Sequence, residues 1–205
     1  MDSRIIQTSY GKVHAKVAGV GPAAVFIHGR VLPLASWQSW KPNLEEVAEA
    51  GFRAIAIDLP GYGEAARAEG AISTESAVDC VLELFDRMPI TRASIVGHNW
   101  GGLIAWRAAL LGKSRVMKLV LVAAEGAEQL IKSLSGELDL PTLVVWAEDD
   151  PCLPVSQAQM FVDSIPKARK HVFAPGEGQP KLNHPEARQL AGKPFNDVVI
   201  EFLKE

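Results

Sequence analysis

Short, mostly apolar runs alternate along this chain with segments whose apolar residues recur at helical spacing. The apolar runs are the segments 23–27, 53–59, 94–96, 116–123 and 142–146. Strands that are apolar on both faces are typical of a sheet covered by helices on both sides. Helical spacing marks the intervening segments 37–50, 74–88, 100–111 and 157–164. The alternation predicts an α/β fold with a mostly parallel, twisted sheet and helices on both faces.

The two ends of the chain extend this pattern. Further strand-like residues occupy the segments 5–8, 13–18 and 170–173. A turn signal over residues 10–12 joins the first two of them, so we expect a hairpin there. A closing helix is expected to run to Leu203, and it begins at Phe195 or as early as Glu186. The chain has no repeats or linker-like stretches, so we expect a single domain over residues 1–205.

Composition excludes several classes of function. The formal net charge of -3 gives no electrostatic case for binding nucleic acid or an anionic membrane. Only two cysteines occur, Cys80 and Cys152, and we find no leader peptide and no apolar stretch long enough to span a membrane. We therefore expect a soluble, cytoplasmic protein. The five histidines lack metal-ligand spacing, so we expect no metal and no cofactor.

The stretch from Gly97 to Gly101 has the spacing of a nucleophile elbow, Gly-x-Asn-x-Gly, between a predicted strand and a predicted helix. Such a strained turn lifts the side chain at its apex above the end of the sheet, where it can attack an electrophile. The apex residue here is Asn99, and an amide is not a nucleophile of this kind.

Four other motifs also lie at ends of predicted strands, where ligands bind in sheets of this type. They are His28-Gly29, the glycine-rich stretch 58–63 that begins with Asp58, the acidic stretch 146–151, and the turn-rich stretch 175–178. Together with the elbow, and in this order, they resemble the α/β-hydrolase family over essentially the whole chain. The segment 125–140, where many members insert a helical cap, is too short for one. The chain is therefore similar to the small, lidless members.

This resemblance implies a role for each site residue. It assigns Asn99 to the nucleophile position, Asp150 to the acid position and Gln179 to the histidine (base) position. The backbone N–H groups of Trp100 and Arg30 would form the oxyanion hole. His28 is expected to hold the loop that carries Arg30, and His98 to pack beside the turn.

The two exchanged residues predict little or no turnover. The amide of Asn99 has no reactive lone pair, and Gln179 cannot take up and release a proton near neutral pH. Gly-His-Asp-Trp-Gly-Gly is the elbow of epoxide hydrolases and haloalkane dehalogenases, which use an aspartate nucleophile. An intact form of this chain is therefore expected to hydrolyse an ester, an epoxide or a haloalkane. Natural loss of function and deliberate inactivation both fit the two exchanges.

Other interpretations stay open at this point. The protein could bind a small molecule without turnover, or run a lyase-type reaction or proton transfer from His98 or His184. Glu125 is an alternative acid position. A small-molecule substrate or ligand is the expected partner, and the sequence does not fix the oligomeric state.

Overall fold

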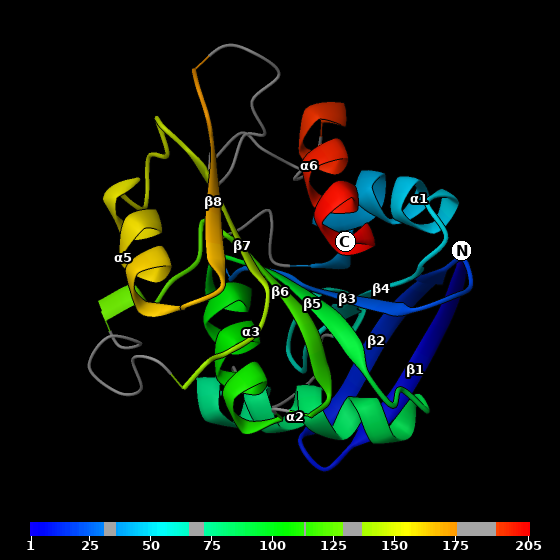
Figure 1. The fold of residues 1–205 in the computed structure, drawn as a ribbon. Coiled ribbons are helices and arrows are strands. Elements are labelled where there is room, and N and C mark those ends of the chain that lie inside the picture. Colours follow the sequence, from blue (N-terminus) through cyan, green and yellow to red (C-terminus); the bar gives the residue numbers. More distant parts are fainter. Residues whose placement is uncertain (31–35, 66–71, 113, 129–136, 176–191) are drawn as a thin grey trace.

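The computed structural model describes residues 1–30, 36–65, 72–112, 114–128, 137–175 and 192–205. Their strands form one eight-stranded sheet in the order β1-β2-β4-β3-β5-β6-β7-β8 (Figure 1). The strands are β1 Asp2–Thr8, β2 Gly11–Ala18, β3 Ala23–Ile27, β4 Arg53–Asp58, β5 Ala93–His98, β6 Val116–Val122, β7 Thr142–Ala147 and β8 Ala168–Phe173. β1, β2 and β4 pair antiparallel, and every other pairing is parallel.

Helices cover both faces of this sheet. They are η1 Trp37–Trp40, α1 Lys41–Glu49, η2 Gly63–Ala65, α2 Thr74–Arg87, α3 Trp100–Leu111, α5 Ser156–Ser164 and α6 Lys193–Lys204. α1 and α6 pack together on one face, and α2 and α3 pack together on the other (Figure 1). The predicted α/β architecture is confirmed. No helix in the described part of the chain is long and apolar enough to span a membrane.

The central strands are buried as their apolar sequences predict. Every residue of β3, β5 and β7 is buried, whereas the edge strand β1 is largely exposed and the edge strand β8 is mostly half-buried or exposed. The hairpin of β1 and β2 forms as expected and begins earlier than predicted, at Asp2. Ala23 to Ile27 therefore lie at the centre of the sheet, with β4 on one side and β5 on the other.

Proline sets the start of two helices. The predicted helix 37–50 is divided into the 3-10 turn η1 and the α-helix α1, because Pro42 stands in the first turn of α1. Pro194 stands in the same place in α6, which begins at Lys193. The alternative start at Glu186 lies outside the described residues.

The connection between β6 and β7 spans residues 123–141, of which 123–128 and 137–141 are described. The described residues of this connection form no cap domain over the sheet.

Candidate active site

The elbow forms where predicted, between β5 and α3. Asn99 is the single residue between these two elements. Its backbone angles are φ 53° and ψ −118°, and a positive φ is strained for a residue with a side chain. The backbone holds this strain in place, because Asn99 N donates to Val122 O at 3.0 Å and Asn99 O accepts from Gly102 N and Glu125 N, each at 3.0 Å. The turn is thus tied both to the helix that follows and to the end of β6.

Two glycines make the tight turn possible. A Cβ atom added to Gly101 would lie 2.4 Å from the carbonyl oxygen of Ile27 and 2.5 Å from that of His28. A Cβ atom on Gly97 would lie 2.3 Å from the carbonyl oxygen of Gly101. The start of α3 therefore rests directly on the end of β3.

We expect Gly101→Ala to lower the free energy of unfolding by about 3 kcal/mol, because backbone atoms must move to admit the methyl group. Urea unfolding measures this. Gly112→Ala is the matched control at the other end of α3, where the side chain of Leu82 is the nearest neighbour and can move. We expect less than about 1 kcal/mol there. Equal losses at both glycines would contradict the close approach of helix and strand.

The side chain of Asn99 is buried, with 2 % of its surface exposed. Its Oδ1 atom has no hydrogen-bond partner among the described residues. A buried amide oxygen without a partner costs about 1–3 kcal/mol, which a hydrogen-bond donor on a ligand would relieve. The geometry therefore offers an acceptor at the apex of the elbow.

Aromatic and charged side chains lie around the elbow. Trp100 is buried, and its Nε1 donates to Thr74 Oγ1 at 3.0 Å. The guanidinium of Arg30 lies 5.8 Å from the centre of the Trp100 ring and donates to Glu125 Oε2 at 3.0 Å. The Tyr62 ring lies 5.6 Å from that of Trp100. The roles of the Trp100 and Arg30 N–H groups as an oxyanion hole remain predictions.

His28 is fully buried, and its hydrogen bonds define its protonation. Its Nδ1 donates to the carbonyl oxygen of Gly29 at 2.6 Å, and its Nε2 accepts from the backbone N–H of Leu59 at 3.2 Å. The ring is therefore neutral, and burial lowers its pKa. His28 thus ties the end of β3 to the end of β4, and this contact is consistent with the expected role in holding the loop.

This burial predicts acid sensitivity. The folded chain keeps His28 neutral, whereas the unfolded chain takes up a proton below about pH 6.5. Stability is therefore full above that pH and is lost as the pH falls below it, by up to about 1.4 kcal/mol per pH unit. Urea unfolding between pH 7 and 5 measures the slope, and His28→Gln should flatten it. An unchanged slope in the variant would contradict the assignment.

His98 is the last residue of β5, directly before Asn99, and is also fully buried. Its ring is edge-on to Trp40, with 6.4 Å between the ring centroids. A Cβ atom on Gly29 would lie 3.0 Å from His98 Nδ1 and 3.1 Å from the Cβ of Asn99. Gly29, which follows the end of β3, therefore packs directly against His98 and the elbow.

The candidate acids lie at different places. Glu125 is joined to the elbow through its backbone N–H. Asp150 follows β7, and its Oδ1 accepts from the backbone N–H groups of Cys152 at 2.9 Å and Leu153 at 2.8 Å, so it organises a turn. Gln179 and His184 fall outside the described residues, and their predicted roles are not tested.

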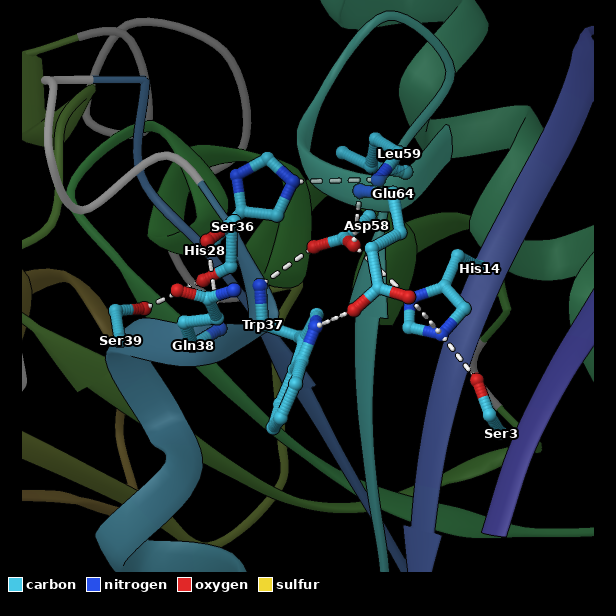
Figure 2. A network of polar contacts seen from close by, with 10 residues as sticks. All are labelled: Ser3, His14, His28, Ser36, Trp37, Gln38, Ser39, Asp58, Leu59 and Glu64. Atoms are coloured by element: carbon cyan, nitrogen blue, oxygen red, sulfur yellow. Dashed lines mark hydrogen bonds and ion pairs between the residues drawn. The ribbon is translucent and has the colours of Figure 1, made fainter. Parts of the chain in front are cut away.

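A polar network beneath the loop was not predicted from the sequence. Asp58 is fully buried. Its Oδ1 accepts from Trp37 N at 2.5 Å, and its Oδ2 lies 2.8 Å from Glu64 N and 3.0 Å from His14 Nδ1 (Figure 2). Asp58 stands at the end of a predicted strand, but the local sequence around His14 carries no signal, because only the β2–β4 register brings His14 opposite Asp58. In the described part of the chain, no group of His, Cys, Asp and Glu side chains could hold a metal ion.

Comparison with known sequences identifies similar proteins. The sequence model of the family described as "alpha/beta hydrolase fold" matches residues 22–130. An epoxide hydrolase from Caballeronia sordidicola is 38% identical over 112 residues, which are 54% of this chain and 33% of that protein. Bifunctional epoxide hydrolase 2 from Sus scrofa is 34% identical over 107 residues, 51% of this chain and 19% of that protein. The chain thus spans a third or less of the length of these two relatives.

A third relative aligns over nearly its whole length. The 2-hydroxy-6-oxononadienedioate/2-hydroxy-6-oxononatrienedioate hydrolase of Cupriavidus pinatubonensis is 24% identical over 268 residues, 94% of this chain and 90% of that protein. Among solved structures, a meta-cleavage product hydrolase from Pseudomonas fluorescens has a TM-score of 0.79 at 20% identity, covering 98% of this chain and 97% of that one. A bromoperoxidase from Bacillus anthracis has a TM-score of 0.80 at 17% identity, covering 100% of both chains. These two likenesses are of fold.

Proposed function

Because the chain belongs to the alpha/beta hydrolase fold family, we propose that it keeps a small-molecule site at the elbow and has lost rapid hydrolytic turnover. The observation that carries this proposal is Asn99, a buried amide held in the strained turn. Its backbone geometry is that of a residue presented to a ligand, and its chemistry is that of a hydrogen-bond partner. We therefore expect Asn99 to bind the kind of small molecule that a nucleophilic residue at position 99 would attack.

The base position supports the same interpretation. Hydrolysis through an ester on the elbow residue needs a group that takes a proton from water, and Gln179, which the family resemblance places there, cannot do so. With both positions exchanged, neither attack nor release of an intermediate has its usual group. We therefore propose that this member of a hydrolase family binds its ligand without turnover or turns it over very slowly.

The ligand class follows from the elbow and from the relatives. Asn in place of Asp leaves the Gly-His-x-Trp-Gly-Gly pattern of enzymes with an aspartate nucleophile. Two similar proteins are named epoxide hydrolases. We infer that the ligand is a small epoxide or ester that also carries a hydroxyl group, bound beside Trp100 and Arg30. Its hydroxyl would donate to Asn99 Oδ1.

A missing cap would leave this site open to water. The alignment with the Cupriavidus hydrolase, at 268 residues, is 63 longer than this chain of 205, so at least that many of its residues in total have no counterpart here. We place the chain among the small members without a cap. An open site excludes water poorly and favours weak, fast-exchanging ligands.

Two measurements test the proposal. We measure hydrolysis of an activated ester, an epoxide and a haloalkane by the unmodified chain and by Asn99→Ala. We expect the same rate in both chains. In NMR titrations with glycidol, an epoxide that carries a hydroxyl group, the indole N–H of Trp100 should shift. The indole N–H of Trp146, bonded to Leu153 O elsewhere in the structure, should stay and is the internal control. Turnover that Asn99→Ala abolishes in a folded chain would overturn the loss of catalysis, and an unmoved Trp100 signal would overturn the site.

The lyase alternative at His98 stays a prediction. This ring is fully buried and packs against Trp40, and Asn99 next to it is buried as well. His184 lies outside the described residues.

A further inference from the structure

A second set of serine, histidine and aspartate side chains lies near the edge of the sheet. Ser3 Oγ is 2.7 Å from His14 Nε2, and His14 Nδ1 is 3.0 Å from Asp58 Oδ2 (Figure 2). Ser3 belongs to the edge strand β1, His14 to β2 and Asp58 to the end of β4. Strands β2, β4 and β3 separate β1 from β5, which carries the elbow. This group is therefore separate from the candidate site at Asn99.

The hydrogen bonds fix one side of the His14 ring. An ionised carboxylate only accepts, so His14 Nδ1 donates to Asp58, and in the neutral ring the Nε2 lone pair faces the hydroxyl of Ser3. The backbone N–H groups of Trp37 and Glu64 also donate to Asp58 and stabilise its negative charge. His14 is 1% exposed and so is fixed in this orientation. A base within reach of a hydroxyl, and oriented by a third group, is the arrangement that activates a serine.

We propose that Ser3 is a nucleophile that accepts acyl groups from small, activated esters. Ser3 Oγ attacks the ester carbonyl carbon while its proton moves to His14 Nε2. The bond to the alcohol oxygen then breaks, and the proton passes from His14 to the departing oxygen. Water, losing a proton to His14, attacks the acyl-serine, and this step releases the carboxylic acid and returns the proton to Ser3 Oγ.

The surroundings of Ser3 suit this substrate class. Ser3 is exposed on the edge strand, where an ester can approach it. Lys16 stands directly opposite Ser3 on β2, and its ammonium is positioned 5.1 Å above the Trp37 ring. This charge would stabilise the oxyanion of the tetrahedral intermediate. Ile5, two residues along the same face and 58% exposed, offers an apolar surface for a short acyl chain.

Glu64 completes the charge pattern. Its Oε2 lies 3.5 Å from His14 Nε2, and its Oε1 accepts from Trp37 Nε1 at 2.8 Å. The imidazolium that forms when His14 takes the serine proton would therefore face two carboxylates, Asp58 and Glu64.

Covalent labelling tests the proposal. The whole chain is treated with a fluorophosphonate, which forms a bond from serine oxygen to phosphorus and releases fluoride with the serine proton, and the labelled peptides are identified by mass spectrometry. We expect Ser3 to react at least about a hundredfold faster than the exposed Ser114 of the same chain, the factor that a positioned base supplies. p-Nitrophenyl acetate should place an acetyl group on Ser3 and release p-nitrophenol.

Variants supply the controls. Ser3→Ala should remove this label and Ser114→Ala should leave it, and both substitutions are on exposed side chains. His14→Gln should slow labelling of Ser3 at least tenfold. If that variant does not fold, the ratio of Ser3 to Ser114 labelling in the unmodified chain still tests whether Ser3 is activated. Equal labelling of the two serines would overturn the proposal. The label is detected on Ser3 itself, so the result of this experiment does not depend on whether the proposed function of the site at Asn99 is correct.

Discussion

Exchanging Asn99 for aspartate and Gln179 for histidine in the same chain is expected to raise hydrolysis of an epoxide, an ester or a haloalkane at least about a hundredfold. The carboxylate supplies the nucleophile at a turn already held in the required strained conformation. The imidazole supplies the base that activates water. Product formation from each of the three substrates, measured against the unmodified chain, checks the expectation.

The single variants separate the two steps. Asn99→Asp alone should attack and then stall, and Gln179→His alone should remain inactive, because each lacks one of the two groups. Urea unfolding confirms that all chains are folded. A folded double variant that is inert on all three substrates would contradict the assignment of Asn99 and Gln179 to the site.

Asp58→Ala is expected to lower the free energy of unfolding by about 3–5 kcal/mol, the largest loss of stability we foresee. The carboxylate is fully buried, and its removal leaves His14 and the backbone N–H groups of Trp37 and Glu64 without their acceptor. The substitution also loosens the start of η1, which follows the loop beside the elbow. Urea unfolding at pH 7 measures the loss.

Glu125→Ala is the matched control for Asp58. Its carboxylate pairs with Arg30 at 3.0 Å, but the Arg30 side chain is 53% exposed. Pairs of this kind contribute about 1 kcal/mol or less. Similar losses in the two variants would show that the buried network does not hold the strand ends together.

The sequence was sufficient to predict the sheet, most helices and the elbow, because these depend on local patterns. Apolar runs on both faces predict central strands such as β3, and paired glycines around Asn99 predict a tight turn. Pro42 marks the start of α1, but the helical spacing of Trp40 and Leu44 concealed that boundary. The spacing continues through a 3-10 turn, so periodicity alone does not separate the two.

The polar network could not be predicted, because it depends on register between distant segments. His14 and Asp58 are 44 residues apart in sequence and become neighbours only when β2 pairs with β4. The contact of Glu125 with the elbow has the same origin, since it arises where β6 ends beside Asn99. Nothing in the local sequence of β1 marks Ser3 as a partner of His14.

The mass of the Asn99→Asp chain after reaction with styrene oxide tests the central claim most directly. A carboxylate at this position can attack the epoxide carbon, whereas release of the ester needs the base that Gln179 does not provide. We predict a gain of one styrene oxide per chain, mapped to the peptide that contains position 99, and no such gain in the unmodified chain. Equal modification of this peptide in both chains, or in neither, would contradict the claim that Asn99 occupies the place of a nucleophile.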